Sequence, residues 1–521
     1  MYGIADGTTV RDLWEEKALT RADHEFLVFE DPDSGRVTTF TYLEFWRSVQ
    51  RVANMFWTHD VRPGDRVGVH LCNSVETLQC LFGLACIGAI TVPLNTTYTP
   101  RECDHILGTC QVRTVVTDVE RLPVYRELTH DIKDLIVVGG ENGHPCFEDL
   151  CAVEPTELVV RPPIASTDPI EIMFTSGTTS RPKGVILTHH NFIFSGLFVN
   201  WELAMTPADR YLTTMAASHI NLQTSALMPV LAAGGTLILE RRYSATRFWA
   251  QVQQHRATLV QGMAMIVRTL MAQPVRPDEQ DHRVREMHYF LPITEQEKLA
   301  FEARYGVTLL NNYGSTETLV GNITDLPFGR RKWPSIGRVG LGYSVRILDT
   351  DGREVPPGEI GEILIKGEPG RTLMAGYWRN EEATDAVLRD GWFRTGDYGY
   401  VDAEGWFYFC DRKVDLIKRA GENVSTTEVE DVLMHHPTVK EAAVIGVPDA
   451  VRDEAVKAFV VPREGTEIDV EDLLRHCQAH LAVFKVPTLV EVIGDLPRGN
   501  YGKVQKQLLV HRERKCNGNQ L

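Results

Sequence analysis

The chain has 521 residues, 43% of them hydrophobic and 24% charged, which is enough apolar material for two or more packed domains. Its formal net charge of −16 argues against nucleic acid or an anionic membrane as the main partner. The ten cysteines contain no CxxC pair and no His/Cys ligand spacing, so reduced thiols are expected and a disulfide scaffold is not. The first residues lack the basic and apolar regions of a secretory signal, and the cytoplasm is the expected location.

The first part of the chain alternates predicted helices and strands. Thr41 followed by Glu44 forms a capping box and predicts an amphipathic helix. Residues 78–94 are too short and too glycine-rich for a membrane span, and they predict a buried helix that runs into a buried strand. Other apolar runs predict further strands at 113–118, 134–139, 171–176 and 234–240. This alternation favours α/β layers with largely parallel sheets.

The pattern changes near residue 335. Short β-rich runs broken by Asp-Gly and Pro-Pro-Gly turns predict an antiparallel or barrel-like subdomain. Beyond residue 411 the pattern is α+β, with Ser425 and Glu428 predicting the start of a helix that ends near His436. The expected fold class is therefore α/β: a large N-terminal domain of α/β layers with a β-barrel-like subdomain, residues 1–411, and a small α+β C-terminal domain, residues 412–521.

The segment "FTSGTTSRPKGV" (174–185) follows a predicted strand and is rich in small hydrogen-bond donors. Hydroxyls and the backbone of a glycine-containing turn suit phosphate oxygens, and Lys183 adds a mobile positive charge. The spacing of a Walker A loop is not present. From composition alone, an ordinary Gly/Ser/Thr surface loop is an equally good interpretation.

The full string, however, resembles the phosphate loop of the ANL superfamily of acyl-CoA synthetases, adenylation domains and luciferases. Four more segments resemble motifs of that superfamily and follow in its order: "NNYGSTET" (311–318), "WFRTGDYGY" (392–400), "DRKVDLIKRAGENVS" (411–425) and "LPRGNYGKVQK" (496–506). Together the five motifs span most of the chain. Within the superfamily, segments such as "RKWPSIGRVG" and "IKRAGENVS" are most similar to the carnitine/crotonobetaine-CoA ligase type.

The resemblance implies an AMP-forming acid–thiol ligase, in which ATP converts a carboxylic acid to an acyl-adenylate and coenzyme A then takes the acyl group. Because the attacking carboxylate and the α-phosphate are both anions, the site must position them and neutralise their charge. By resemblance, the residues that hold the β- and γ-phosphates are Thr175, Ser176, Gly177, Thr178, Thr179 and Lys183.

Five further residues are assigned to the nucleotide by the same resemblance. Thr316 is expected to donate to the α-phosphate, and Glu317 to bind Mg²⁺, a cation that prefers carboxylate oxygen. Tyr313 is expected to lie against the adenine. Asp397 is expected to accept the ribose hydroxyls, with Arg412 assisting.

Lys503 is the expected catalytic cation between the carboxylate and the α-phosphate. Taken alone it would be read as a solvated lysine of a polar tail, but "LPRGNYG" before it favours the catalytic role. By resemblance, the small domain is mobile: it rotates about a hinge at 413–415, withdraws Lys503 and presents "RAGENVS", in which Gly421 lines the pantetheine tunnel. His219 corresponds to a gating residue beside the acyl group, although a histidine satisfied in the core is nearly as good an interpretation.

The sequence also departs from the family pattern. Val414 stands at the hinge, Ala420 replaces the first glycine of a Gly-Gly pair, and residues 290–292 (Phe-Leu-Pro) replace a glycine-rich turn of the acyl pocket. The expected acyl-pocket residues are Trp201, His219, Asn221, Met263 and Met265. Because these residues are mostly apolar with a few polar groups, two classes of substrate remain: a carnitine-like acid and a bulky polycyclic or aromatic acid.

Alternative functions also stay open. One is a stand-alone adenylating enzyme that loads a carrier protein, and another is a catalytically silent nucleotide-binding relative; a luciferase-like role fits least. The joint presence of Lys183, Glu317, Asp397 and Lys503 argues against the silent relative. The expected partners are therefore a small carboxylic acid, ATP and CoA, with neither nucleic acid nor membrane, and a homodimer is compatible with the family.

Overall fold

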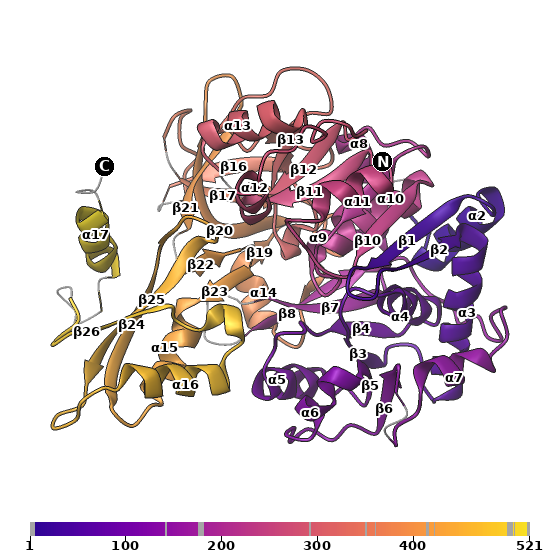
Figure 1. Ribbon diagram of the computed structural model, residues 1–521, viewed down its shortest axis with the longest axis horizontal. Coiled ribbons are helices and arrows are strands. Elements are labelled where there is room, and N and C mark those ends of the chain that lie inside the picture. Colours follow the sequence, from indigo (N-terminus) through magenta and orange to yellow (C-terminus); the bar gives the residue numbers. More distant parts are fainter. Residues whose placement is uncertain are drawn as a thin grey trace.

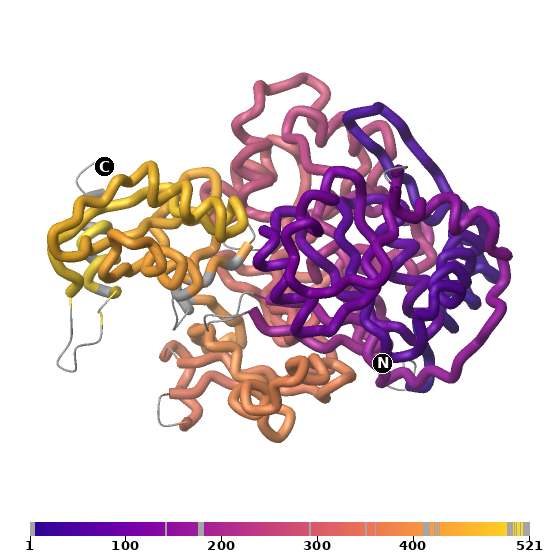
Figure 2. The backbone as a smooth tube through the Cα atoms, turned by 90° about the horizontal axis from the view of Figure 1, so that it is seen from below, coloured from indigo at the N-terminus to yellow at the C-terminus, as the bar shows by residue number. Residues whose placement is uncertain are grey.

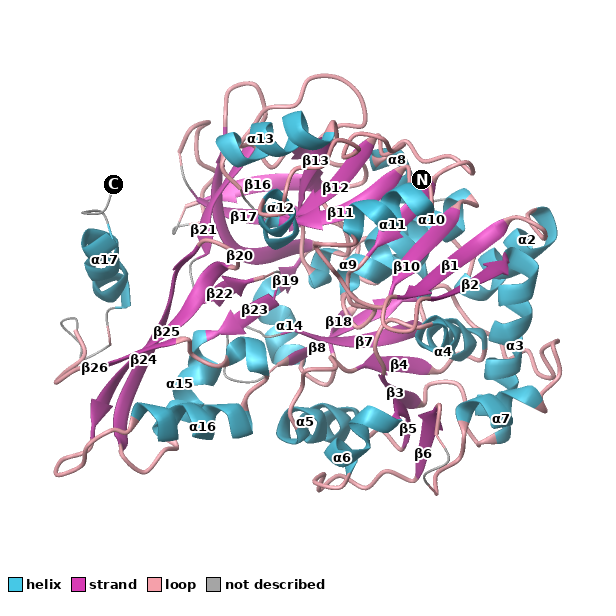
Figure 3. Cartoon of the chain, viewed as in Figure 1, coloured by secondary structure: helices cyan, strands magenta, loops and turns pink. Residues whose placement is uncertain are grey.

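The computed structural model describes residues 6–140, 143–175, 182–290, 293–349, 352–359, 361–412, 416–420, 422–497, 504 and 506–517. Four sheets organise the described residues (Figures 1 and 3). Three of them belong to a large domain that comprises everything before strand β22 (Leu416–Arg419). The fourth sheet and helices α15 (Thr426–Met434), α16 (Val470–His480) and α17 (Lys506–Asn517) form a small domain, the yellow lobe at one end of the molecule in Figure 2.

The largest sheet has nine strands in the order β15-β14-β13-β12-β11-β9-β10-β1-β2. Its six central strands, from β13 to β1, are parallel to one another, and antiparallel strands are added at both ends. The bounds are β1 (Glu25–Asp31), β2 (Arg36–Thr41), β9 (Arg210–Thr213), β10 (Thr236–Glu240), β11 (Leu259–Met263), β12 (Glu286–Phe290), β13 (Thr308–Tyr313), β14 (Ile323–Thr324) and β15 (Arg338–Val339).

The second sheet has seven strands in the order β18-β8-β7-β4-β3-β5-β6. Strands β7, β4, β3, β5 and β6 are parallel, and β8 turns back antiparallel to β7. The bounds are β3 (Arg66–His70), β4 (Ile90–Pro93), β5 (Thr114–Asp118), β6 (Asp134–Val138), β7 (Pro169–Thr175), β8 (Lys183–Thr188) and β18 (Gly376–Tyr377).

Helices cover these two sheets, and their starts follow the sequence signals. Thr41 and Glu44 form the predicted capping box of α3 (Tyr42–Thr58), whose apolar face is buried. The others of the large domain are α2 (Val10–Thr20), α4 (Val75–Cys86), α5 (Pro100–Cys110), α6 (Leu122–Tyr125), α7 (Phe147–Ala152), α8 (His189–Glu202), α9 (Ile220–Leu222), α10 (Met228–Ala233), α11 (Phe248–Gln254), α12 (Ala264–Met271), α13 (Glu295–Tyr305) and α14 (Glu381–Val387). Three short non-α turns accompany them: η1 (Val119–Arg121), the π-helical η2 (Gln223–Leu227) and η3 (Thr316–Thr318).

The third sheet of the large domain is antiparallel, as the turn-rich sequence after residue 335 predicts. Its order is β16-β17-β20-β19, with β21 also paired to β20. The bounds are β16 (Ser344–Leu348), β17 (Gly361–Lys366), β19 (Leu388–Arg389), β20 (Trp392–Val401) and β21 (Phe407–Arg412). Strand β21 leads out of this sheet toward the small domain.

The small domain has its own core. Its sheet runs β23-β22-β25-β24, with β26 parallel to β25. The remaining bounds are β23 (Glu422–Ser425), β24 (Val439–Asp449), β25 (Asp453–Pro462), β26 (Leu489–Val492) and the turn η4 (Val483–Lys485). Two apolar clusters, one on each face of β24 and β25, contain residues of this domain alone. The large-domain core forms two other clusters, so each domain has a core of its own.

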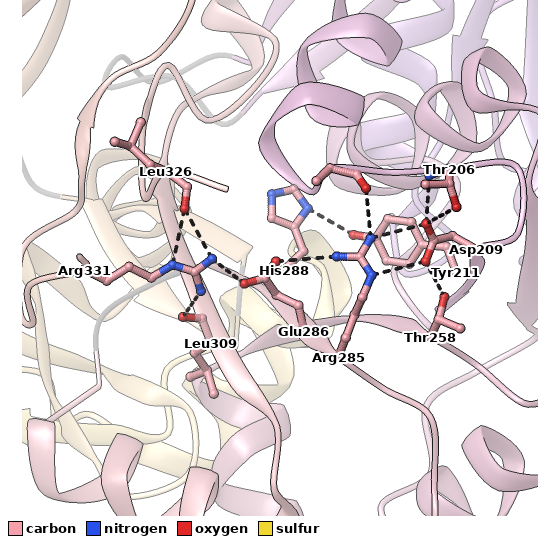
Figure 4. A network of polar contacts seen from close by, with 11 residues as sticks. Thr206, Asp209, Tyr211, Thr258, Arg285, Glu286, His288, Leu309, Leu326 and Arg331 are labelled. Carbon is pink, nitrogen blue, oxygen red and sulfur yellow. Dashed lines mark hydrogen bonds and ion pairs between the residues drawn. The ribbon is translucent and has the colours of Figure 1, made fainter. Parts of the chain in front are cut away.

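Polar contacts tie the strands of the nine-stranded sheet together (Figure 4). The guanidinium of Arg285 donates to both carboxylate oxygens of Asp209, at 3.2 and 3.3 Å. The Tyr211 hydroxyl lies 3.0 Å from Nδ1 of His288 on β12. Arg331 pairs with Glu286 at 2.5 Å. Arg331 also donates to the backbone carbonyl of Leu309 on β13 at 3.3 Å. These contacts link β9, β12 and β13, and the far ends of β12 and β13 carry residues of the candidate site.

The expected α/β fold class is thus what the chain adopts, and the predicted strand runs fall on β5, β6, β7 and β10. Residues 78–94 form α4 and β4, a buried helix and strand. In the described part of the chain, none of the helices combines the length and apolarity needed to cross a membrane.

Candidate active site

A cavity of about 520 Å³ opens where strand ends from the three large-domain sheets meet the small domain. Its volume is in the range of small-molecule sites. The motif residues in its wall come from three separate stretches of sequence and are Thr175, Lys183, Tyr313, Thr316, Glu317 and Asp397. The fold therefore brings together the described members of the predicted nucleotide site.

Thr175 and Lys183 form one end of the cavity. Thr175 is the last residue of β7, Lys183 is the first of β8, and the two are direct partners in the antiparallel pairing. The connection between them is the segment expected to hold phosphates. Ser176, Gly177, Thr178 and Thr179 lie outside the described residues, so their assignment stays a prediction.

Tyr377 joins two of the predicted residues. Its hydroxyl donates to Oε1 of Glu317 at 3.0 Å, and the ammonium of Lys183 lies 5.0 Å from its ring centroid. Burial and the neighbouring Glu317 carboxylate raise the pKa of Tyr377, so its hydroxyl keeps its proton and remains a donor. Because β18 pairs with β8, Tyr377 is held on the strand next to Lys183. One side chain thus orients both a carboxylate and a cation at this end of the cavity.

The loop after β13 carries Thr316 and Glu317. Thr316 is 8% exposed and begins η3, where both residues face the cavity. The backbone carbonyl of Glu317 accepts from the N–H of Met374 at 2.9 Å, which ties η3 to the segment leading into β18. Gly314 is required in this loop because a Cβ there would lie 2.0 Å from the carbonyl oxygen of Val320. The loop is therefore held tightly by backbone contacts.

Tyr313 and Asp397 meet at the other side of the cavity. The Tyr313 hydroxyl donates to Oδ2 of Asp397 at 2.6 Å, and Asp397 is 2% exposed. The register of β20 and β21 places Arg412 directly opposite Asp397. The side chain of Arg412 lies outside the described residues, so its contact with a ribose stays a prediction.

His219 lines the same cavity and is half-buried. Its Nδ1 accepts from the backbone N–H of Asn221 at 3.2 Å, which caps the short helix α9 and fixes the ring. His219 therefore both caps α9 and lines the cavity. The interpretation as a purely core histidine does not fit this position.

The expected acyl pocket is corrected in part. Asn221 and Met263 line the cavity, but among the described residues neither Trp201 nor Met265 does. Trp201 packs against Phe198 on its own helix, with ring centroids 5.4 Å apart, and Met265 lies on α12, beyond the strand end that carries Met263. Phe290, in place of the usual glycine-rich turn, is part of the wall, while Leu291 and Pro292 lie outside the described residues.

The small domain contributes Lys418 to the cavity wall. Lys418 is on β22, and its ammonium lies 4.5 Å from the ring centroid of Phe409. Ala420, at the turn of the β22–β23 hairpin, has a φ of 51°, a left-handed conformation that favours glycine. The hairpin thus faces the site in this arrangement.

The predicted residues Val414, Gly421 and Lys503 lie outside the described residues. Val504, which follows Lys503, packs with the small-domain cluster that contains Leu496 and Leu509. Lys506 binds Glu430 of α15 at 2.7 Å. The described cation of the small domain at the cavity is therefore Lys418, which the sequence argument had not selected.

Sequence reasoning also missed Tyr377, Ser225 and Trp333 in the cavity wall. The signal for Tyr377 is the run "MAGYW" (374–378), which follows the glutamate motif and pairs with the strand of Lys183. Ser225 and Trp333 carry no local signal, since only the three-dimensional arrangement places them at the cavity.

Taken together, the cavity offers hydroxyls, Lys183 and Glu317 at one end and Asp397 beside aromatic rings toward the other. This combination suits a polyphosphate with a bound cation, a ribose and a flat base. The remaining wall, with Asn221, Met263 and Phe290, is mostly apolar with a polar edge and leaves space for an organic acid.

Comparison with known proteins agrees with this chemistry. The family described as AMP-binding enzyme matches residues 14–378, and the AMP-binding enzyme C-terminal domain matches residues 428–503. Crotonobetaine/carnitine–CoA ligases are 43% identical (Salmonella choleraesuis strain SC-B67) and 44% identical (Escherichia coli strain ATCC 8739) over 515 residues. In both comparisons the match covers 97% of this chain and 99% of the relative.

Solved structures match over most of the chain as well. A double mutant of o-succinylbenzoate CoA synthetase from Bacillus subtilis, bound to a product analogue, has a TM-score of 0.86 at 28% identity and covers 97% of this chain and 99% of its own. ATP-bound MatB from Rhodopseudomonas palustris has a TM-score of 0.70 at 28% identity, with 98% and 100% coverage. On the family matches and on the identity over nearly its whole length, this chain belongs to the AMP-binding enzyme family.

Proposed function

We propose that this chain, an ATP-dependent and AMP-forming acyl-CoA ligase, activates an acid of the carnitine and crotonobetaine class. The observation that carries the reaction is the convergence of Lys183, Thr316, Glu317 and Asp397 on one cavity from three motifs that lie far apart in the sequence. The acid class is supported by the 43–44% identity to crotonobetaine/carnitine–CoA ligases over nearly the full length of both chains.

In the first half-reaction, a carboxylate oxygen attacks the α-phosphorus of ATP, an acyl-adenylate forms and pyrophosphate leaves. Lys183 and the loop before it would hold the outer phosphates, and Thr316 would donate to the α-phosphate. Tyr313 and Asp397 would bind the adenosine. Because the two reactants repel each other, fixing their geometry and neutralising their charge accounts for most of the acceleration.

The oxygen donors at this end of the cavity fit Mg²⁺. Oε1 of Glu317 accepts a hydrogen bond from Tyr377, and Glu317 lines the same cavity as Thr175 and Lys183, the residues at which β7 ends and β8 begins. Mg²⁺ prefers a carboxylate together with phosphate oxygens, and it would supply charge neutralisation on the phosphates. Glu317 would hold it, and Tyr377 would keep the carboxylate in one orientation.

In the second half-reaction, the thiol of CoA attacks the acyl carbonyl and AMP leaves. A thiol is nucleophilic enough to need little help from a base. We propose the domain boundary at residues 411/412, where β21 of the large domain ends, and infer that the small domain is mobile. The arrangement described here, with Lys418 and the β22–β23 hairpin at the cavity, would serve this second step. Lys503 would reach the cavity for the first step after a rotation of the small domain.

The test is a panel of carboxylic acids incubated with ATP and Mg²⁺, with and without CoA, in which pyrophosphate and AMP are followed separately. We expect acid-dependent pyrophosphate release without CoA and stoichiometric AMP and thioester once CoA is added, with carnitine-type acids turned over most efficiently. Efficient turnover of bulky aromatic acids alone would contradict the substrate class. AMP release that requires a carrier protein in place of CoA would contradict the acceptor. A cytoplasmic location and a homodimer remain predictions.

A further inference from the structure

A buried lysine connects the two domains. Lys485, in η4 of the small domain, is 2% exposed. Its ammonium lies 2.6 Å from Oε1 of Glu102 on α5 of the large domain and 2.9 Å from Oε1 of Glu428 on α15 of the small domain. We call Glu102, Glu428 and Lys485 the interdomain ion cluster. One ammonium thus bridges a carboxylate from each domain in a position shielded from water.

The large-domain half of this cluster is oriented by contacts that do not involve Lys485. Oε2 of Glu102 accepts from the backbone N–H and the hydroxyl of Thr99, at 2.8 and 2.9 Å, in the capping box of α5. Its other oxygen, Oε1, is the one that binds Lys485. The ring of Tyr98 lies 5.5 Å from the ammonium and covers it from the same side. The large domain therefore presents a fixed receptor for a cation.

Both carboxylates stabilise the positive charge of Lys485. Burial lowers the pKa of Lys485, but the charges of Glu428 and Glu102 outweigh this effect and raise it. Lys485 therefore stays charged in the cluster. A buried charge is stable only while its partners remain in place, because removing one leaves the others desolvated and uncompensated. Separation of the domains at this point is accordingly costly unless water enters.

The cluster is mechanically linked to the cavity. The guanidinium of Arg419 donates to the carbonyls of Phe484 and Val486, at 2.8 and 3.1 Å, on either side of Lys485. Arg419 follows Lys418 on β22, and Lys418 lines the cavity. A shift of η4 relative to α5 would therefore move Arg419 and, with it, the neighbouring Lys418 that faces the cavity.

We propose that Lys485 is a positioning residue for the thioester-forming step. It binds Glu102 only in the domain arrangement that places the β22–β23 hairpin at the cavity, and it thereby stabilises that arrangement. The inference rests on the proposed domain rotation. Lys485 keeps Glu428 as its partner when the small domain moves, because both belong to that domain, and it loses Glu102. The interdomain ion cluster therefore stabilises the domain arrangement for thioester formation relative to the arrangement for adenylation.

The test compares Lys485→Met with Lys457→Met in single-turnover assays of the two half-reactions. Lys457 pairs with Glu491 and Glu513 of the small domain itself and is the matched control. We expect Lys485→Met to slow thioester formation from isolated acyl-adenylate by about tenfold, in the range of a typical coupling between sites. Adenylation, followed as pyrophosphate release, should stay within about twofold of the wild type or rise. Lys457→Met should leave the ratio of the two rates unchanged.

Two further variants separate positioning from simple loss of stability. Glu102→Gln keeps a residue compatible with the capping box and removes the charge, so it should lower the same step by several-fold. The exchange Glu102→Lys with Lys485→Glu should recover more thioester formation than either single variant. Equal slowing of both half-reactions by Lys485→Met, or no change in either, would overturn the proposal. A wild type that forms no acyl-adenylate would instead refute the proposed function.

Discussion

The two sides of the cavity are built differently. On the large-domain side, predicted site residues touch one another or a shared neighbour: Tyr313 binds Asp397, and Tyr377 joins Glu317 to Lys183. On the small-domain side, the hairpin that carries Lys418 is held against the large domain by a few polar contacts, among them Lys485–Glu102, Arg268–Asp453 and Asn95–Glu422. The comparison teaches that the predicted nucleotide site is built on strand ends and joined by internal contacts, whereas the small domain is attached through a few polar side chains.

The largest effect is expected for Lys503, which is predicted to act in the first half-reaction and not in the second. Lys503→Ala should lower acyl-adenylate formation by on the order of 10³-fold, because no other cation would bridge the two anions in the transition state. Thioester formation from supplied acyl-adenylate should remain close to wild type. Pyrophosphate and thioester are measured separately in rapid-quench experiments. Equal loss in both half-reactions would show that the lysine is not specific to the first.

A second variant tests the rigidity of the large-domain side. Gly314→Ala adds a methyl group that would lie 2.0 Å from the carbonyl oxygen of Val320, so the loop that carries Thr316 must shift. Since small displacements of catalytic groups cost on the order of 10²-fold, adenylation should fall by about that factor. Gly494→Ala is the control, because a Cβ there meets open space. ATP binding is measured calorimetrically, and unchanged affinity and rate in Gly314→Ala would contradict a tightly held loop.

A third variant tests the link made by Tyr377. Tyr377→Phe keeps the ring beside Lys183 and removes the hydrogen bond to Glu317. A hydrogen bond to a charged group is worth about 1.5–3 kcal/mol, so adenylation should fall about tenfold at limiting Mg²⁺. Tyr377→Leu should weaken ATP binding further, because the ring is lost as well. The Mg²⁺ concentration for half-maximal rate and Mn²⁺ binding by the ATP complex are the measurements, and identical metal dependence in Tyr377→Phe would count against the link.

The smallest effect on catalysis is expected for a buried carboxyl on the strand that leads to Thr175, which acts on stability instead. Burial raises the pKa of Glu171 to about 8, against a contact with Gln223 that lowers it. The folded state therefore keeps the proton between the unfolded-state pKa of 4.5 and about pH 8. The protonated carboxyl therefore contributes to the free energy of unfolding. This contribution is fully present below pH 4.5 and is lost as the pH rises to about 8, by about 1.4 kcal/mol per pH unit.

Glu171→Gln should accordingly flatten the dependence of the free energy of unfolding on pH over this interval. Urea denaturation at several pH values is the measurement. If wild type and Glu171→Gln lose stability in parallel as the pH rises, Glu171 is ionised in the folded protein and the argument fails.

The sequence predicted the local features well, for physical reasons. The capping box at Thr41, the strand before Thr175 and the antiparallel region after residue 335 depend on near neighbours, and each is found. The motif residues Tyr313, Thr316 and Asp397 follow from resemblance, and their segments converge on the cavity. These features require no knowledge of distant contacts.

Contacts between distant segments could not be read from the sequence. Trp201 was expected in the acyl pocket, but it packs against Phe198, since a pattern cannot tell which face of a helix meets a cavity. Tyr377 reaches Glu317 across 60 positions of sequence, and Lys485 reaches Glu102 across 383. Such pairs depend on how sheets and domains are stacked, and only the three-dimensional arrangement reveals them.

The most direct test of the account is the distance between the domains during the reaction. Spin labels introduced through unnatural amino acids at exposed Val153 of the large domain and exposed Leu489 of the small domain report it by pulsed electron resonance. With the thioester product bound, we expect one distance that matches the arrangement described here. With ATP and an unreactive acid analogue, a second distance should dominate. One unchanged distance in both states would contradict a small domain that serves the two steps in turn.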